Sequence, residues 1–426
     1  MGNKKKSKGI FIPTFFLFLS ISFLIGCDKN AFTKSQKIPL GELITIKHNP
    51  DSFPKTQSHD YYHNWYSPIK SYLVATDNGY MRVQLEGGAA HAIYYNNDFT
   101  YTKHITIPKE LEKSGAFYAT NDNYFLLTGQ DNPDNDENAE VLRITKYDKN
   151  WNRLASKSLH GWNTNSPFTA GSANITHVGN FLFIHTCHTM FNAHQANLTF
   201  SLNITTMEVV QKFFGVGYSN GYCSHSFNQH ITNDENHIVQ VDHGDAYPRS
   251  IVLTLYRANA SEGKYREGGK INNIEIFPIT GKTGANYTGV SLGGVAVSTD
   301  SYLVVGNSIN QKLFNQKNNE KRNIFISATN KIEAVATKPI YLTKEASKVG
   351  NPYIVTLTKD TFLVIWTEDN QIVYQEVNGF GRPARDIFNA EGTLSDCKPI
   401  VKENKIVWFV SNNKGLTFYA LPFQAK

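Results

Sequence analysis

The sequence predicts an all-β fold built from a repeated four-stranded unit, and three observations carry this prediction. One phrase recurs along the chain: a polar turn rich in Asn and Asp, a run of apolar and β-branched residues, and another polar turn. Successive copies are 43 to 65 residues apart, a length that suits four short strands with their loops. Helical periodicity is nearly absent. Together these observations predict a seven-bladed β-propeller of four-stranded antiparallel blades.

Each copy of the phrase marks one predicted blade. A weak first copy at 70–76 is followed by six stronger ones, at 123–129, 179–185, 235–241, 300–306, 360–366 and 403–409. A single blade cannot bury both of its faces, and stacking blades around an axis covers them. Two β-sandwich domains are the alternative architecture, but they account less well for the long, regular repeat.

The end of the chain indicates how the ring closes. The last unit, between Lys398 and Leu421, has room for only three strands. An N-terminal strand that completes the last blade is the usual way to close a propeller, and we expect residues 43–47 to supply it. The predicted organisation is therefore a signal peptide at 1–26, a tether with the closing strand at 27–65, and the propeller at 66–426.

The N-terminus has the three-part layout of a secretory signal. A basic segment, Lys4 to Lys8, precedes an apolar run from Ile10 to Ile25, and the run ends in Leu24-Ile25-Gly26-Cys27. These last four residues resemble the bacterial lipobox, in which a small residue precedes a cysteine that is lipidated and becomes the new N-terminus. The resemblance implies an exported lipoprotein, held on the extracytoplasmic side of a bacterial membrane by acyl chains, such as palmitate, on Cys27. An uncleaved membrane anchor is the alternative, although the run is short for a span that needs about twenty residues.

Composition and charge exclude several classes of protein. Of the 426 residues, 40% are hydrophobic and 13% aromatic, which is enough to build a core and excludes intrinsic disorder. The formal net charge of +6 is misleading, because four lysines and no acidic residue precede Cys27. The rest of the chain carries 38 basic and 36 acidic residues, a balance that argues against a nucleic-acid partner.

Histidines are concentrated in the third and fourth predicted blades. Seven of the 14 histidines lie between residues 185 and 243. In a propeller, the loops that enter a blade and the loops between its second and third strands share one face with the mouth of the axial channel. We therefore expect one ligand site there, made of polar residues from these loops: His188, His194, Asn197, His225, Asn228, Asp242, His243, Asp245 and Arg249.

These residue types suit a polar or anionic ligand. The planar guanidinium of Arg249 can donate paired hydrogen bonds to a sulfate, phosphate or carboxylate group. Asp242 or Asp245 could orient an imidazole. The first interpretation is binding of a small molecule, a glycan or an envelope protein. The alternative is an enzyme of group transfer or hydrolysis, in which a histidine acts as nucleophile or base and Arg249 and Asn228 stabilise the anion. In residue types alone, the set is similar to bacterial arylsulfotransferases, which are propellers that use His, Asn and Arg on the same face.

Two further interpretations concern the cysteines. Cys187, His188, Cys223 and His225 are a candidate tetrahedral metal site, although their spacing is not that of a zinc finger. In an oxidising compartment Cys187 and Cys223 are instead a candidate disulfide between the two blades. The histidine loops also allow a purely structural role, in which these side chains hydrogen-bond to one another. No nucleotide-binding, G-x-S-x-G or HExxH motif occurs, so the sequence assigns no cofactor.

Overall fold

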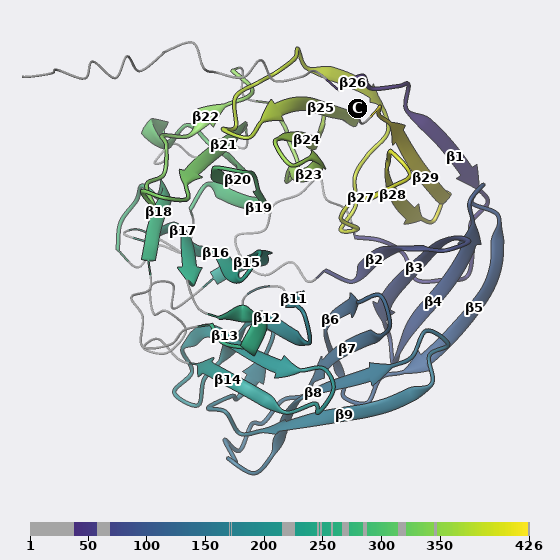
Figure 1. Ribbon diagram of the computed structural model, residues 1–426, viewed down its shortest axis with the longest axis vertical. Helices are drawn as coiled ribbons and strands as arrows, with labels where there is room; N and C mark the ends of the chain where they lie inside the picture. Colours follow the sequence, from purple (N-terminus) through teal and green to yellow (C-terminus); the bar gives the residue numbers. More distant parts are fainter. Residues whose placement is uncertain are drawn as a thin grey trace, which may run out of the picture. The chain divides into compact units, whose positions relative to one another are not determined.

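Seven four-stranded antiparallel sheets form a ring, which confirms the predicted seven-bladed β-propeller (Figure 1). The computed structural model describes residues 38–57, 69–169, 171, 173–214, 226–244, 247, 249–256, 259–265, 272–283, 288–313, 321–344 and 347–424. Helix is scarce in these segments, which contain the short 3-10 helices η1 (Ala260–Glu262) and η2 (Gln311–Leu313). No helix within the described ranges is long and apolar enough to cross a membrane.

In each of the first three blades the strands follow chain order from the axis outward. Blade 1 contains β2 (Ser71–Thr76), β3 (Gly79–Glu86), β4 (Ala89–Asn96) and β5 (Tyr101–Pro108). Blade 2 contains β6 (Lys113–Ala119), β7 (Tyr124–Gly129), β8 (Glu140–Tyr147) and β9 (Arg153–His160). Blade 3 contains β11 (Asn174–Val178), β12 (Phe181–Thr189), β13 (Gln195–Asn203) and β14 (Val209–Phe214), with a two-residue strand β10 (Ser166–Pro167) that also pairs with β12.

The next three blades repeat the same order. Blade 4 contains β15 (Ser226–Asp234), β16 (His237–Gly244), β17 (Ser250–Tyr256) and β18 (Asn272–Pro278). Blade 5 contains β19 (Val290–Val297), β20 (Ser301–Ser308), β21 (Asn323–Asn330) and β22 (Ile340–Tyr341). Blade 6 contains β23 (Tyr353–Thr358), β24 (Thr361–Glu368), β25 (Gln371–Asn378) and β26 (Phe388–Glu391).

Blade 7 joins the two ends of the propeller. It contains β27 (Ile400–Lys402), β28 (Lys405–Asn412), β29 (Gly415–Pro422) and, as its outer strand, β1 (Ile44–His48). β1 pairs with β29 from Ile44 opposite Ala420 to His48 opposite Leu416. The prediction of a closing strand at 43–47 is therefore confirmed, with the strand one residue further along the chain.

Polar turns set the hairpins, as the repeated phrase indicates. Between β27 and β28, Glu403 and Asn404 both have positive φ, 49° and 57°. Between β24 and β25, Asp369 and Asn370 have φ of 47° and 65°. Two successive residues of positive φ give a turn whose twist matches that of the flanking strands, and Asn tolerates this conformation better than most residues.

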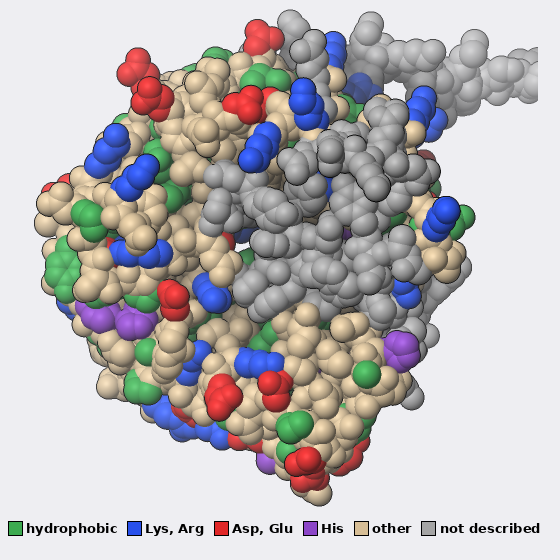
Figure 2. Space-filling view, turned by 180° about the vertical axis from the view of Figure 1, so that it is seen from behind, with side chains coloured by type: hydrophobic (Ala, Val, Ile, Leu, Met, Phe, Trp, Pro, Cys, Tyr) green, Lys and Arg blue, Asp and Glu red, His purple; other side chains and the backbone are tan. Residues whose placement is uncertain are grey.

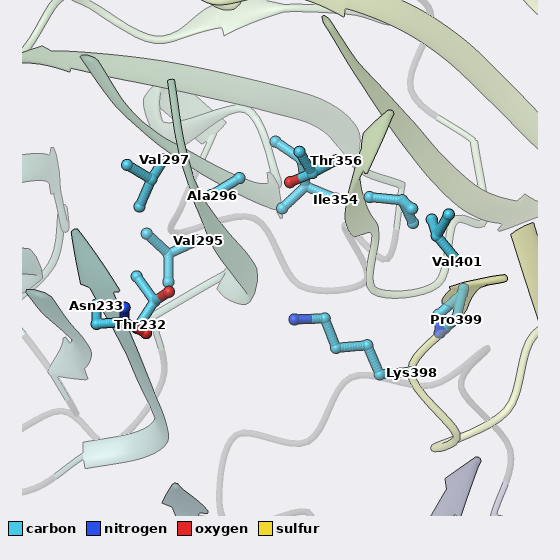
Figure 3. Close-up of a pocket in the computed structure, with 11 residues that line it drawn as sticks. Thr232, Asn233, Val295, Ala296, Val297, Ile354, Thr356, Lys398, Pro399 and Val401 are labelled. Carbon is cyan, nitrogen blue, oxygen red and sulfur yellow. The ribbon is translucent and has the colours of Figure 1, made fainter. Parts of the chain in front are cut away.

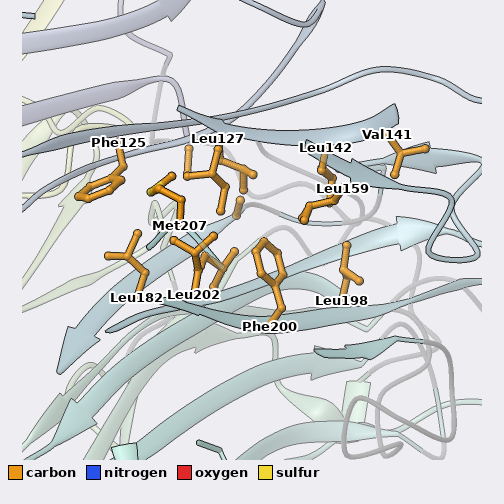
Figure 4. Packing of buried hydrophobic residues seen from close by; sticks show 14 of the residues in the cluster. Phe125, Leu127, Val141, Leu142, Leu159, Leu182, Leu198, Phe200, Leu202 and Met207 are labelled. Carbon is orange, nitrogen blue, oxygen red and sulfur yellow. The ribbon is translucent and has the colours of Figure 1, made fainter. Parts of the chain in front are cut away.

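Apolar side chains fill the gaps between neighbouring blades. Each of the seven gaps has its own buried cluster within the described residues. In the gap between blades 2 and 3, Leu127 and Leu142 of one sheet face Leu198 and Phe200 of the other (Figure 4). Full burial of one such side chain stabilises the fold by about 1.5–3 kcal/mol, so these layers hold the ring together. The smallest described cluster, around Phe183 and Tyr256, lies between blades 3 and 4.

Six of the seven repeats match second strands, and the first does not. The weak copy at 70–76 corresponds to β2, the inner strand of blade 1, whereas the second strand of that blade is β3. β3 has no uninterrupted apolar run, because Arg82 and Gln84 alternate with its apolar residues. Both are nonetheless buried, and the Arg82 guanidinium donates to Gln84 Oε1 (2.9 Å) and Asp51 Oδ2 (3.0 Å).

Candidate functional site

The antiparallel pairing places the ends of certain strands at one face of the ring. The start of each inner strand pairs with the end of the second strand, as Asn174 does with His185 and Val290 with Ser308. We call this face, at which the inner strands begin, the start face. It carries the loops in which the sequence places its candidate residues.

Strand alternation divides the histidines of β12 between two gaps. Leu182 and Ile184 of β12 pack in the cluster between blades 2 and 3, and successive residues of a strand point to opposite faces. His188 therefore lies on the side of blade 2. His185 and Cys187 lie on the side of blade 4. Because Cys187 and His188 point away from each other, they do not form the adjacent ligand pair that the metal interpretation requires.

His185 is held between two blades by a carboxylate and a hydroxyl. Its Nε2 lies 2.9 Å from Asp242 Oδ1 of blade 4, and its Nδ1 lies 2.8 Å from Thr199 Oγ1 of blade 3. All three side chains are buried. Asp242 Oδ1 accepts a hydrogen bond from Nε2–H, and Nδ1 then accepts one from the hydroxyl group of Thr199. With both nitrogens engaged and no exposed surface, His185 orders the gap and does not present a nitrogen to a ligand.

Asn197 lies beside this group. It pairs with Cys187 across β12 and β13, and its side chain is fully buried. Neither its Oδ1 nor its Nδ2 has a hydrogen-bond partner within the described part of the chain. A buried amide without partners costs about 1–3 kcal/mol for each unmet group, so Asn197 marks a place where water or a ligand is expected.

His188 is a neutral imidazole on the other side of β12. Its Nδ1 lies 2.7 Å from Thr164 Oγ1, and the side chain is fully buried. Burial lowers its pKa from 6.5 to about 3, because the charged form loses its hydration. His188 therefore remains uncharged at neutral pH and is unsuited to act as a general base at pH 7.

The remaining candidates are spread over other places. His243 faces blade 5, where its Nε2 lies 3.0 Å from Thr288 Oγ1, and Asn228 reaches the Leu292 carbonyl of the same blade (3.5 Å). Arg249 is half-buried next to Gly244, and His194 is exposed on the loop between β12 and β13. His225, Asp245, Cys223 and Cys27 lie outside the described residues, and so therefore does the predicted Cys187–Cys223 disulfide.

The described candidates do not all lie in one gap between blades. The structure brings Asp242 to His185 and places Asn197 in the same gap, but it directs His188 toward blade 2 and His243 toward blade 5. The physical reason is the two-residue period of the strands, which sends neighbouring side chains into different gaps. Within the described residues, no cluster of three or more metal-ligating side chains occurs.

The start face has a cleft that the sequence did not indicate. It has a volume of about 470 Å³ and lies where blades 1, 2 and 3 meet. Its charged lining consists of lysines and glutamates from blades 1 and 2: Lys70, Glu86, Lys109, Glu112 and Lys113. Pro167, Phe168 and Thr169 close the side toward blade 3. We call this feature the lysine cleft.

The lysines of this cleft differ in their surroundings. Lys113 forms an ion pair with Asp131, whereas Lys109 donates to the Glu112 carbonyl (2.7 Å). Burial, and secondly the charge of Lys70, lower the pKa of Lys109. Lys70 forms no ion pair with any described residue. The cleft thus holds two like charges, at Lys70 and Lys109, that a bound anion would stabilise together.

Residues 164–169 form one wall of this cleft and connect it to β12, the strand that carries His185 and His188. Ser166 and Pro167 pair with Thr189 and His188 of β12. Phe168 packs against blade 2 at two glycines: a Cβ on Gly115 would lie 2.4 Å from the Phe168 ring, and one on Gly129 would lie 2.8 Å from it. The lysine cleft and His188 are therefore connected through a single segment, which lines the cleft and pairs with β12.

On the face shown in Figure 2, the described residues form no large patch of one charge. On the side opposite to the view of Figure 1, lysine and arginine side chains are interspersed with acidic ones (Figure 2). This distribution agrees with the near balance of charge along the chain beyond Cys27.

Comparisons with known proteins identify the fold only. No family model matches the chain, and no curated protein matches it. Among solved structures, an ulvan lyase of polysaccharide lyase family PL25 bound to -[GlcA(1-4)Rha3S]- is similar, with a TM-score of 0.52, 8% identity, and 88% of this chain and 95% of that chain covered. A second structure of a PL25 ulvan lyase gives a TM-score of 0.53 at the same identity and coverage. Saccharomyces cerevisiae Sqt1 gives a TM-score of 0.46 at 9% identity, with 81% of each chain covered.

Proposed function

We propose that this chain is an exported, lipid-anchored protein whose propeller binds an acidic saccharide at the lysine cleft. One observation carries the proposal: Lys70 and Lys109, two cations close enough for one to lower the pKa of the other, line a single cleft on the start face. A carboxylate or sulfate group placed between them relieves their repulsion and gains charge-assisted hydrogen bonds.

The rest of the lining suits a sugar. Glu86 and Glu112 supply acceptors for hydroxyl groups, and Ser114 and Thr169 supply hydroxyls. Phe168 adds an apolar surface, which sugar rings use through their C–H faces. The cleft volume of about 470 Å³ lies within the usual range of about 300–1,000 Å³ for ligand pockets.

Binding agrees better than catalysis with the described histidines. His185 has both nitrogens engaged, and His188 is buried and neutral, so neither is available to transfer a proton to a substrate. The ulvan lyase that resembles this chain was solved with an acidic, sulfated saccharide. At 8% identity that likeness shows the fold alone, and the saccharide is proposed here from the side chains of the cleft.

Calorimetric titration of the full chain in detergent tests the binding. The probes are an oligogalacturonate, a sulfated carrageenan oligosaccharide and neutral maltotetraose. We expect the two acidic probes to bind and the neutral one not to bind. Lys70→Ser and Lys109→Ser should each weaken binding of the acidic probes about tenfold, which is equivalent to about 1.4 kcal/mol of binding free energy.

The matched control is Lys157→Ser, because Lys157 pairs with Glu208 on another surface. It should leave the affinity unchanged. Equal binding of neutral and acidic probes, or an equal loss in the control, would contradict the proposal.

The anchor is the second part of the proposal and rests on the N-terminal sequence alone. Cys27→Ala should move the protein from the membrane fraction to the soluble fraction and remove its acyl mass, whereas Asp28→Asn should keep both. An unchanged distribution of Cys27→Ala would contradict lipidation at this residue.

A further inference from the structure

A separate cavity lies in the axial channel of the ring. It has a volume of about 320 Å³ and is lined by the inner strands of blades 4, 5 and 6 together with residues 398–401 of blade 7. Aliphatic side chains such as Val295, Val297 and Ile354 form part of its wall, and polar atoms supply the larger share of its surface. Lys398 is the only charged residue in its described lining (Figure 3).

The Lys398 side chain extends into this cavity. It is solvent-exposed, and in Figure 3 its ammonium points across the channel toward Thr232 and Asn233 of β15. Within the described residues the ammonium has no hydrogen bond and no carboxylate partner. Protein surrounds the channel, and the resulting desolvation lowers the pKa of Lys398.

Polar groups of the opposite wall are placed to assist a ligand. Thr356 is exposed to the channel, and Thr232 lies on the facing strand. Asn233 accepts a hydrogen bond at Oδ1 from Thr176 Oγ1 (2.8 Å), which fixes its amide and leaves the NH₂ group as a donor. One cation together with several neutral donors around a single cavity provides the groups that an anion site needs.

We propose that Lys398 forms a second binding site, inside the channel, for a small anion with a carboxylate, sulfate or phosphate group. The cavity is about two thirds the volume of the lysine cleft, which favours a small molecule over a polymer. The site shares no residue with the lysine cleft, so its existence is independent of the saccharide proposal.

Competitive lysine labelling tests the site in the full chain. The protein is treated with limiting succinimidyl acetate at pH 7.5, and the acetylation of each lysine is followed by mass spectrometry. Lys398 should react faster than Lys402, whose ammonium donates to the carbonyls of Thr76 and Gly79 (both 3.0 Å). Sulfate or phosphate at about ten times its dissociation constant should slow labelling of Lys398 about tenfold, and sodium chloride of equal ionic strength should not.

Thermal unfolding provides an independent test that requires no labelling. Sulfate and phosphate should raise the Tm of the wild type more than that of Lys398→Met, which keeps only the general stabilisation by these salts, and Thr356→Val should reduce the difference. Lys414→Met, at an exposed turn residue, should behave like the wild type. A Lys398 that labels no faster than Lys402, labelling unaffected by either anion, or an equal Tm shift in Lys398→Met would overturn the proposal. Loss of saccharide binding in Lys70→Ser with an intact sulfate effect would separate the two sites.

Discussion

His185 of blade 3 and Asp242 of blade 4 are joined by a buried hydrogen bond of 2.9 Å. It lies in the gap with the smallest described apolar cluster, so polar contacts contribute a larger share of the adhesion between these two blades. Asp242→Ala should lower the free energy of unfolding by about 1–3 kcal/mol, because it leaves a buried imidazole nitrogen without its partner. Asp242→Asn keeps an acceptor and should cost less.

Urea denaturation followed by tryptophan fluorescence measures these differences. Asp386→Ala, at an exposed position, serves as the control. An unfolding free energy of Asp242→Ala equal to that of the control would show that the contact contributes nothing to the adhesion of the blades.

The neutral state of His188 predicts a dependence of stability on pH. Its pKa is about 3 in the folded chain and about 6.5 when unfolded, so the unfolded chain binds the proton between these values. The stabilisation is complete above pH 6.5 and is lost as the pH falls toward 3. Between pH 6 and 4 the wild type should lose about 1.4 kcal/mol per pH unit more than His188→Gln. Parallel stability curves for the two proteins would refute this assignment.

The inner strands of blades 5 and 6 approach each other so closely that one position requires glycine. A Cβ on Gly293 would lie 2.1 Å from the Pro352 carbonyl oxygen, a backbone atom that cannot rotate away. Gly293→Ala should therefore destabilise the protein by about 1–3 kcal/mol. Its neighbour is a close control, because a Cβ on Gly294 meets Ile354 at an ordinary 3.5 Å. Similar Tm values for the Gly293→Ala and Gly294→Ala proteins would contradict the packing argument.

Asp396 links the two ends of the ring next to the lysine cleft. Its Oδ1 accepts from the backbone N–H of Gln57 (2.9 Å), and its Oδ2 accepts from those of Lys70 (2.9 Å) and Ser71 (3.1 Å). Asp396→Ala should increase hydrogen exchange at Lys70 and Ser71 and weaken binding of the acidic saccharide, because Lys70 loses its fixed position. Asp300→Ala, at an exposed turn, should change neither. Unaltered exchange at both amides in Asp396→Ala would exclude this role.

The sequence predicted most of the fold because the second strands carry the signal. They are buried on both faces between neighbouring blades, so their residues form uninterrupted apolar runs, as at Phe362 to Trp366. β3 does not show this apolar pattern, because its buried Arg82 has Asp51 as its partner. This ion pair cannot be recognised from the sequence, because Asp51 lies 31 residues from Arg82, in the segment before blade 1.

The candidate site was less accessible to prediction. The density of histidines drew attention to blades 3 and 4, where His185 is hydrogen-bonded to Asp242, but His185 was not among the predicted site residues. The lysine cleft gave no signal, because Lys70 and Lys109 are ordinary surface residues in sequence and become neighbours only when β2 and β5 fold into one blade. The position of Lys398 was equally hidden in the sequence, because the residues that line its cavity come together only when the ring closes.

The most direct test of ligand binding is a crystal structure of the protein with an oligogalacturonate. Our account predicts electron density in the lysine cleft, with a carboxylate oxygen about 2.7–3.2 Å from Lys70 Nζ or Lys109 Nζ and a sugar ring against Phe168. A saccharide bound elsewhere on the propeller, with the lysine cleft occupied only by water, would contradict it.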